Sequence, residues 1–214
     1  MDKKGIKMEE YGFYAMLDRM QYINRWGLMR NTRTENIKEH SFDVAVIAFA
    51  LCSIHNNMAK GDETAIRPDP YKVQAYALYH DCTEIITGDL PTPIKYRSRE
   101  ITSAYKEVEH EAALSLVDLL PEDEELRSQY LDLLDPAKDT DEKILMHKLV
   151  KAADKIAAYI KCLREESSGS TEFSAAKKAT GEAVKAMGLP EADYFMKHYV
   201  PPYGYTLDEI SGKA

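Results

Sequence analysis

Apolar residues recur along this 214-residue chain at intervals of three and four, which is the spacing of amphipathic helices. No alternating apolar and polar pattern, typical of half-buried strands, competes with it. The pattern breaks where proline, glycine or clustered polar residues occur. The sequence therefore predicts an all-α fold, with helices over about 8–25, 34–55, 70–87 and 98–120, a short one from 121, and others over about 140–166, 171–187 and 190–199.

The connections between these helices carry their own signals. Trp26–Arg33 holds two arginines and a glycine and follows directly on Arg25, and Asn56–Pro70 is polar, so both are expected to be loops. Asp69 is a good N-cap residue, with Pro70 at the first helical position. The sequence GDLPTP at 88–93 holds two prolines in three residues, which a continuing helix does not tolerate, so it is expected to be a structured loop.

Composition narrows the class of protein. A hydrophobic fraction of 44% with 30% charged residues is that of a soluble globular chain, and its length fits one domain over residues 1–214. The net charge of −8 argues against a nucleic-acid polymer as partner, because a phosphate backbone demands a basic surface. A small phosphorylated molecule needs only one or two local cations and remains possible as a substrate.

Cysteine usage and the N-terminus indicate the compartment. Cys52, Cys82 and Cys162 are odd in number, widely spaced and set in apolar helical stretches, so they are expected to be reduced core residues. The N-terminus lacks the apolar stretch of a signal peptide, and no apolar run reaches the roughly 20 residues that span a bilayer. These features favour a cytoplasmic protein with no membrane partner.

Four ligand-type residues lie in apolar helical settings. His80 and Asp81 are adjacent within VQAYALYHDCTEII, and burying such a pair is costly unless a bound ion compensates both groups. His40 shares a helix face with Val44, and Asp154 aligns with apolar neighbours in LMHKLVKAADKIAAYI. A single inward histidine or aspartate is more often a satisfied core residue. Four together predict a divalent metal site, for which Zn, Mn, Fe, Co or Ni suits mixed imidazole and carboxylate ligands.

The remaining histidines fit this site less well. His55 lies at a helix end, His110 in a charged helix, His147 beside Lys148, and His198 near the C-terminus. Surface or capping roles are expected for each of them.

A divalent ion in such a site can lower the pKa of bound water and polarise a phosphoryl oxygen. Glu84 follows Asp81 by three positions, one helical turn away, and is a candidate general acid or base, either on the attacking water or on the leaving oxygen. An outward glutamate or a support for a histidine is the alternative for Glu84. Glu35 and Glu39 are either supports for His40 or a solvated acidic first turn.

The order His…His-Asp…Asp resembles the HD-domain metal-dependent phosphohydrolases. Three segments, INRWGLMRNTRTENIKEHS at 23–41, YHDCTEIITGDLPTPIKY at 79–96 and KAADKIAAYIKCLRE at 151–165, are similar to the bacterial 5′-deoxynucleotidase branch of that superfamily, as is DYFMKHYVPPYGYTLDEI near the C-terminus. The resemblance implies an HD-type helical bundle, with a metal core over about 23–165 and C-terminal helices over 171–200. It implies a homodimer that hydrolyses deoxyribonucleoside 5′-monophosphates with one divalent ion such as Co, Mn or Zn.

The resemblance also assigns roles. His40, His80, Asp81 and Asp154 become the metal ligands, and Arg25 the residue that contacts phosphate, a choice that the residues alone leave open between Arg25, Arg30 and Arg33. Beside Arg25, Trp26 is expected to pack against the sugar and to exclude a 2′-hydroxyl, although a core or hinge aromatic is the alternative.

The remaining expected contacts lie in the GDLPTP loop and at the metal. Asp89 can accept a hydrogen bond from a 3′-hydroxyl. The expected catalytic residues are Glu84, Arg25 and Asp81, and the expected substrate contacts are Arg25, Trp26, His40, Asp81, Asp89, Leu90, Pro91, Thr92 and Asp154.

Two alternatives differ in class. Another HD phosphohydrolase would act on dNTPs, cyclic dinucleotides or guanosine polyphosphates, substrates whose greater charge calls for more clustered lysine and arginine than this chain offers. A non-catalytic, metal-stabilised signalling module would keep the four ligands but would have no need of Glu84, Arg25 and Asp89 together.

Overall fold

The computed structural model describes residues 10–95 and 97–212, without the side chains of Thr92 and Pro93. Within these ranges it is built from helices, and its one extended pairing is an isolated bridge between Asn24 and Asn36. The all-α prediction is therefore confirmed. The elements are α1 Phe13–Asp18, the 3-10 helix η1 Arg19–Tyr22, α2 Ile37–Met58, α3 Pro70–Tyr79, α4 Glu84–Thr87, α5 Thr92–Lys95, α6 Arg99–Val117, α7 Glu124–Leu134, α8 Asp141–Ser167, α9 Ser174–Ala186, α10 Pro190–His198, the 3-10 helix η2 Pro201–Gly204, and α11 Leu207–Ile210.

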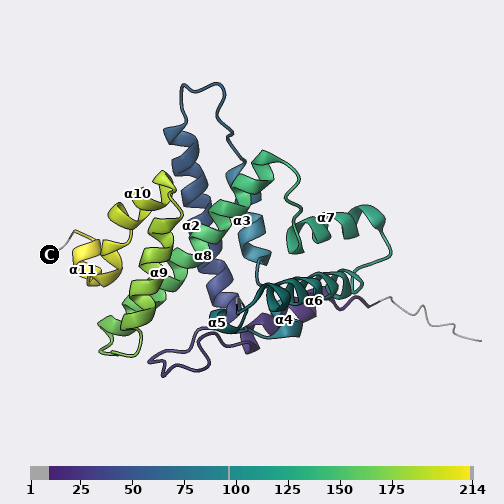
Figure 1. The fold of residues 1–214 in the computed structure, drawn as a ribbon, viewed down its shortest axis with the longest axis horizontal. Helices are drawn as coiled ribbons and strands as arrows, with labels where there is room; N and C mark the ends of the chain where they lie inside the picture. The colour runs from purple at the N-terminus through teal and green to yellow at the C-terminus, as the bar shows by residue number, and fades with distance from the viewer. Residues whose placement is uncertain (1–9, 96, 213–214) are drawn as a thin grey trace, which may run out of the picture.

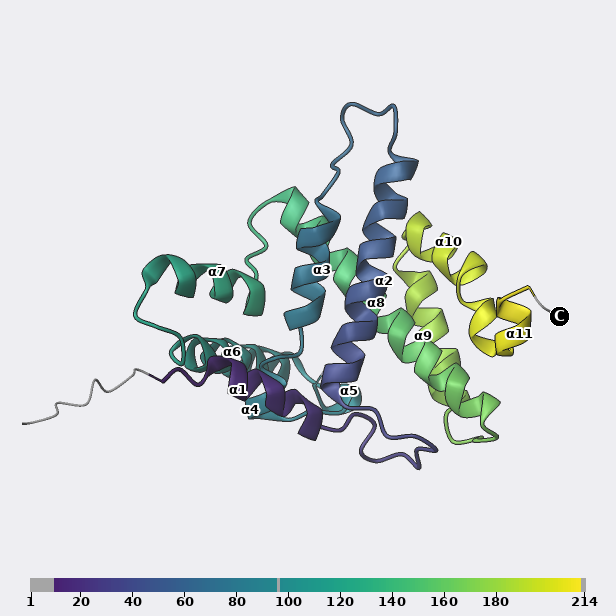
Figure 2. The same ribbon diagram turned by 180° about the vertical axis from the view of Figure 1, so that it is seen from behind.

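Two long helices form the centre of the molecule. α2 has 22 residues and α8 has 27, and α3 packs beside both (Figure 1). α9, α10 and α11 lie on one side of this centre, and α6 and α7 lie on the other, as the view from behind also shows (Figure 2). α1 and α4 lie next to α6.

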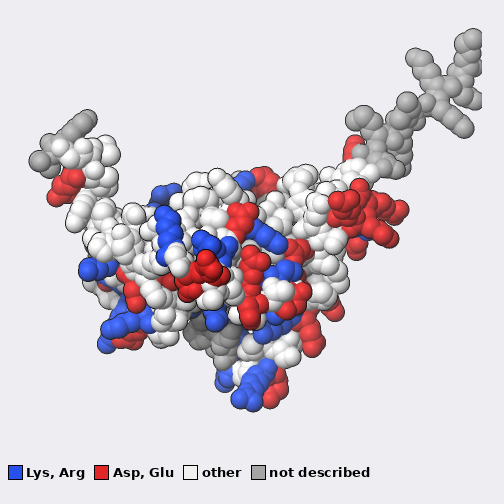
Figure 3. Space-filling model, turned by 90° about the horizontal axis from the view of Figure 1, so that it is seen from above, with Lys and Arg blue, Asp and Glu red and all other residues white. Residues whose placement is uncertain are grey.

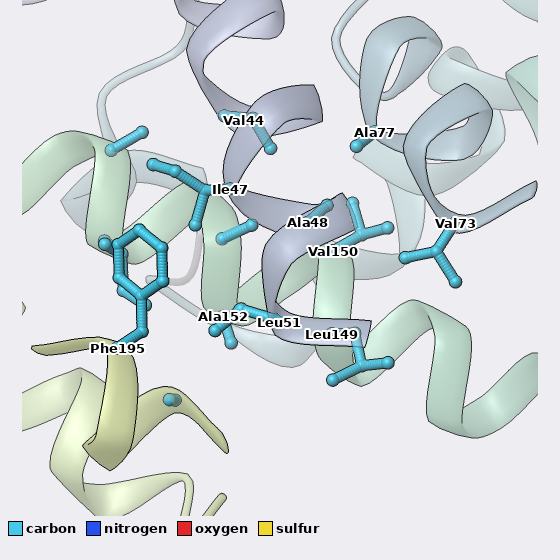
Figure 4. Packing of buried hydrophobic residues seen from close by; sticks show 14 of the residues in the cluster. Val44, Ile47, Ala48, Leu51, Val73, Ala77, Leu149, Val150, Ala152 and Phe195 are labelled. Carbon is cyan, nitrogen blue, oxygen red and sulfur yellow. The ribbon is translucent and has the colours of Figure 1, made fainter. Parts of the chain in front are cut away.

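The buried apolar residues form two clusters. The larger one joins α2, α3, α8, α9 and α10, and Figure 4 shows part of it, with Leu51 of α2 near Leu149 of α8. The smaller one joins α1, η1, α6 and α7 and includes Ile37 at the start of α2 and Cys82 after α3. Removing such surface from water is the main stabilising contribution to a fold of this kind. Both clusters contain residues of α2 and of the stretch around α3, so the two meet along these segments.

Side-chain caps fix where several helices begin. Asp69 accepts a hydrogen bond from the Tyr71 backbone N–H at 2.9 Å, with Pro70 at the first helical position, as predicted. Asn36 caps α2 and Thr140 caps α8 in the same way. The two central helices are therefore fixed in register at their N-terminal ends.

Two predicted helices differ from the observed ones. The first two residues of the expected helix over 8–25, residues 8 and 9, lie outside the described residues, and its described part ends at Tyr22. The backbone of 23–25 is instead paired with 35–37: the Ile37 N–H donates to the Ile23 carbonyl and the Arg25 N–H to the Glu35 carbonyl, both at 2.9 Å. Pairing with a segment ten to fourteen residues later in the chain thus ends this helix.

The expected helix over 70–87 is interrupted at His80–Thr83. This turn separates α3 from α4 and is held by shorter-range bonds, with the Cys82 N–H donating to the Tyr79 carbonyl and the Glu84 N–H to the Asp81 carbonyl. His80 and Asp81 therefore lie in a turn and not on a continuous helix face. The turn lets two adjacent side chains face the same point.

The distribution of charged side chains and the hydropathy of the helices can be compared with the sequence analysis. The face in Figure 3 shows acidic and basic side chains interspersed. None of the described helices is long and apolar enough to cross a membrane. Cys52, Cys82 and Cys162 are buried and unbridged, as predicted.

Candidate functional site

The predicted ligand residues converge where the two apolar clusters meet. His40 lies on α2 between Ile37 of the smaller cluster and Val44 of the larger one, and it is fully buried. His80 and Asp81 are supplied by the turn after α3, and Asp154 by the middle of α8. Three separate segments thus direct two imidazoles and two carboxylates to one point.

The distances within this group are short. His40 Nε2 lies 3.1 Å from Asp154 Oδ1 and 3.7 Å from Asp81 Oδ2. His80 Nε2 lies 3.2 Å from Asp81 Oδ1, and the two imidazole rings are 5.4 Å apart. Ligand atoms of His40, His80 and Asp154 all lie within 4.8 Å of one another, so one ion can contact all three. Asp81 presents one oxygen to each histidine.

The histidines are oriented as metal-binding histidines usually are. His80 Nδ1 is 2.7 Å from the Ala77 carbonyl, an acceptor only, so this nitrogen carries the proton and Nε2 presents a lone pair. Buried His80 Nε2 has no hydrogen-bond partner among the described residues. In His40, Nδ1 faces Glu35 Oε1 at 3.3 Å, which leaves Nε2 directed toward the carboxylates. The residues therefore fit a divalent ion.

The site carries a strong local field. Burial raises the pKa of both Asp81 and Asp154, but the neighbouring histidines and Arg25 outweigh it, so the pKa of each carboxyl lies well below its usual range. Burial lowers the pKa of His40, yet Asp154 and Glu35 bring it above its ordinary value. The site thus holds two ionised carboxylates, the ligand form that a cation requires.

Arg25 reaches into the same group of carboxylates. Its Nη1 donates to Asp81 Oδ2 at 3.2 Å, its Nη2 lies 3.9 Å from Asp154 Oδ1, and its Nε lies 3.4 Å from Glu35 Oε1. The guanidinium is 13% exposed, so it is fixed in place and partly shielded from water. Arg30 instead pairs with Glu172 on the surface, and Arg33 is exposed next to Glu39.

Glu84 is a buried carboxyl beside the turn. Its side chain is 6% exposed overall, and Oε2 has no hydrogen-bond partner among the described residues. Burial, together with the nearby Asp81 and Asp89, raises the pKa of Glu84 to about 9. Such a group is able to hold and release a proton, so Glu84 meets the requirement for an acid or base. Burial also raises the pKa of Asp89.

Trp26 lies next to Arg25 in a strained conformation. Its φ of 58° makes it the one described non-glycine residue in the left-handed region. Its indole packs edge to face on Phe173, with ring centroids 5.4 Å apart, and its backbone is close enough to the Asp89 carboxyl to lower the pKa of that group slightly. The GDLPTP loop therefore lies next to the segment that carries Trp26.

The remaining predicted contacts have simpler surroundings. Leu90 and Pro91 are half-buried, Thr92 begins α5, and the side chain of Thr92 lies outside the described residues. Outside this group, His55 lies 3.3 Å from Glu191, His110 lies 2.6 Å from Asp135, and His198 stacks on Tyr194.

Several residues at the site were missed or ranked low from the sequence. Glu35, one of two open choices, contacts both His40 and Arg25, whereas Glu39 faces Arg33 at the surface. Phe173 behind Trp26 carried no signal beyond being aromatic. Lys161 and Glu165 are buried behind the loop, and their position on the apolar face of α8 is the signal that was available.

Comparison with known proteins gives a consistent result. The family model described as "5′-deoxynucleotidase YfbR-like" matches residues 12–203. The chain is 44% identical to "5′-deoxynucleotidase Ent638_2835" of Enterobacter sp. (strain 638) over 204 residues, 95% of this chain and 98% of the relative. It is 45% identical to the 5′-deoxynucleotidase of Photorhabdus temperata over 93% of this chain and 96% of that one. A 5′-deoxynucleotidase YfbR of Escherichia coli (strain ATCC 8739) matches at 44% over 95% of this chain and 98% of that one.

Solved structures share the fold at lower identity. An HD-domain phosphohydrolase from Listeria innocua superimposes with a TM-score of 0.71 at 22% identity, covering 94% of this chain and 98% of that one. A cyanophage S-2L HD phosphohydrolase, bound to dA and one catalytic Zn²⁺ ion, superimposes with a TM-score of 0.59 at 19% identity, over 87% of this chain and 95% of that one.

Proposed function

The chain belongs to the YfbR-like 5′-deoxynucleotidase family, and we propose that it hydrolyses deoxyribonucleoside 5′-monophosphates to a deoxynucleoside and phosphate. The observation that carries this proposal is the convergence of His40, His80 and Asp154 on one point, with Asp81 against both histidines and Arg25 and Glu84 nearby. A phosphomonoester needs a nucleophile, charge neutralisation and a proton for the leaving oxygen. This group of side chains is suited to supply all three.

His40, His80, Asp81 and Asp154 are the residues that would hold one divalent ion, with Co, Mn and Zn all compatible with the donor set. The chemistry that a divalent ion supplies in such a site is activation of water and polarisation of a phosphoryl oxygen. Glu35 fixes the orientation of His40, and the Ala77 carbonyl fixes that of His80.

Arg25 is assigned to binding of the phosphate group. Its guanidinium lies within 4 Å of Asp81 and Asp154 while keeping a planar fork of donors that matches phosphate oxygens. Glu84 is assigned the proton transfer. Its raised pKa supports a role as acid toward the leaving 5′-oxygen, with the base toward water as the alternative role.

Trp26 and Asp89 are assigned to binding of the sugar. The Asp89 carboxyl lies close to the Trp26 backbone, so the acceptor proposed for a 3′-hydroxyl and the wall proposed against C2′ are neighbours. A ribose hydroxyl against such a wall would be both crowded and unpaired, which lowers kcat/KM for ribonucleotides. Leu90, Pro91 and Thr92 are assigned the remaining substrate contacts.

Phosphate release from dAMP and AMP, measured in parallel on metal-stripped protein resupplied with Co, Mn, Zn or Mg, tests the proposal. We expect metal-dependent release from dAMP with little from AMP. Equal rates on the two substrates would still support nucleotidase activity, but they would contradict the proposed role of Trp26 in excluding ribose. Absence of release from either, with metal bound, would direct the search to dNTPs, cyclic dinucleotides or guanosine polyphosphates, or to a non-catalytic module.

We also propose a homodimer in the cytoplasm, organised as one domain with its metal core over about 23–165 and C-terminal helices over 171–200. The family membership supports these features. Size-exclusion chromatography with light scattering tests the oligomeric state, and a monomer at micromolar concentration would contradict it.

A further inference from the structure

The segment that carries Trp26 is a loop closed at its base. Asn24 and Asn36 form a bridge, and the backbone bonds from Ile37 to Ile23 and from Arg25 to Glu35 complete it. The chain therefore leaves and returns at one place. We call the segment between these points the 24–36 loop. Its position depends on the contacts that hold it beyond this closed base.

Two charged side chains buried in α8 anchor the loop at Thr32 and Arg33. Glu165 is 1% exposed, and its carboxylate accepts the backbone N–H of Thr32 at 2.7 Å and of Arg33 at 3.3 Å. Lys161, one helical turn earlier and 5% exposed, donates to Glu165 and to the Arg33 carbonyl. Burying two charges is expensive unless their hydrogen bonds are satisfied. Here those bonds are made to the loop backbone, so the pair is directed at the loop.

Phe173 links the anchor to the indole of Trp26. It is fully buried, and its ring centroid lies 5.4 Å from that of Trp26 and 5.5 Å from the Lys161 ammonium. Aromatic pairs and cations over rings have defined geometries. Lys161, Phe173 and Trp26 therefore form one contiguous row from α8 to the site.

Trp26 itself needs external support. A positive φ is costly for a bulky residue and persists where the surroundings impose it. The Trp26 carbonyl accepts bonds from the Met29 N–H at 2.9 Å and from the Asn31 side chain at 3.2 Å, and both donors lie within the same loop. The conformation of Trp26 is thus tied to the position of the loop, and the loop to Glu165 and Lys161.

We propose that Glu165, Lys161 and Phe173 are positioning residues that hold Trp26 in place and thereby set the discrimination between deoxyribose and ribose substrates. This inference rests on the proposed role of Trp26 against the sugar. When the support is removed, the indole gains freedom to withdraw, and space opens for a 2′-hydroxyl. Deoxynucleotide turnover depends on Arg25 and the metal ligands and is expected to change less.

The test compares kcat/KM for dAMP and AMP in Glu165→Gln and Phe173→Leu. We expect the dAMP preference to fall about tenfold or more, mainly through faster AMP turnover. Phe173→Leu leaves no buried charge unpaired, so it tests the proposal even where Glu165→Gln does not fold. Glu166→Gln is a matched control, because it removes the adjacent ion pair to Lys177, 2.6 Å long, which lies outside the row. Phe195→Leu controls for loss of a buried ring elsewhere.

A second readout follows Trp26 directly, because it is the only tryptophan in the chain. Glu165→Gln and Phe173→Leu should shift its fluorescence to longer wavelength and increase quenching by acrylamide, while both controls should match the wild type. If the wild type prefers dAMP and every variant keeps that preference, the positioning inference is overturned while the proposed role of Trp26 stands. Equal wild-type rates on dAMP and AMP would overturn the proposed role of Trp26, and the inference with it.

Discussion

At the scale of single residues, the proposed chemistry depends on buried polar atoms with few protein partners. Glu84 Oε2 and His80 Nε2 both lack hydrogen-bond partners among the described residues. Such atoms cost free energy in a folded protein, since a lost hydrogen bond to water is not replaced. Both belong to the segment 80–84 that carries Asp81, the carboxylate that Arg25 contacts, so they are suited to take partners when metal and substrate bind.

Glu84→Gln is expected to lower kcat by about 10² to 10⁴ while leaving the fold and the bound metal unchanged. Glutamine keeps the size of the protonated side chain but has no proton to transfer. Steady-state kinetics with elemental analysis of the purified variant would check this. Turnover within threefold of the wild type would remove Glu84 from the mechanism.

Glu35→Ala is expected to weaken metal binding by about 10- to 100-fold, because His40 loses the carboxylate that orients its ring. Competition with a chelating dye measures the affinity. Glu39→Ala, one turn later on the surface, is the matched control and should bind metal as the wild type does.

At the scale of elements, the site joins parts of the chain that are far apart in sequence. His40 belongs to α2, His80 and Asp81 to the turn between α3 and α4, and Asp154 to α8. An ion held by all four would fasten these three segments together at the meeting point of the two apolar clusters. Its binding energy is therefore also energy that favours the folded arrangement.

Adding Co, Mn or Zn to the stripped protein is expected to stabilise it by about 2.7 kcal/mol at a metal concentration one hundred times the dissociation constant. Differential scanning fluorimetry would detect this as a rise in Tm. The variant Asp154→Asn should show a much smaller rise, and an equal rise in both would place the ion elsewhere.

The sequence predicted the helices and the converging ligands well, for local reasons. His40 and Asp154 lie on periodic apolar faces, and Asp69 and Pro70 carry an explicit start signal. The break at His80–Thr83 was missed because it contains neither glycine nor proline. The early end of the first helix follows from pairing between 23–25 and 35–37, which periodicity does not encode. Lys161 and Glu165 lie on the apolar face of α8, but their i, i+4 spacing is also that of an ordinary surface ion pair, so their burial was not predicted.

At the scale of the whole molecule, the pH dependence of stability depends on His147, which lies among basic side chains. His147 of α8 is half-buried beside three lysines, and burial together with Lys138, Lys151 and Lys106 lowers its pKa to about 4. In the unfolded chain the same imidazole would titrate near 6.5. Unfolding between these two pH values therefore takes up a proton.

The folded state is expected to lose stability as the pH falls from about 6.5 to 4, because the unfolded chain binds a proton at His147 that the folded chain rejects. The contribution is on the order of 1–3 kcal/mol. Urea unfolding across this range should show a shallower decline for His147→Gln than for the wild type. The same decline in both would remove His147 as its cause. His198→Gln, stacked on Tyr194, is the control.

The closed base of the 24–36 loop has a consequence for protein engineering. Because the Asn24–Asn36 bridge and the bonds at Ile23 and Ile37 are made by backbone atoms, they place few demands on the side chains between them. The segment is thus a cassette, which can be exchanged for the equivalent segment of a relative that keeps Arg25, Glu35 and the α2 cap Asn36. A chimera that receives the cassette together with its matching residues at 161, 165 and 173 should acquire the donor's sugar preference as a unit.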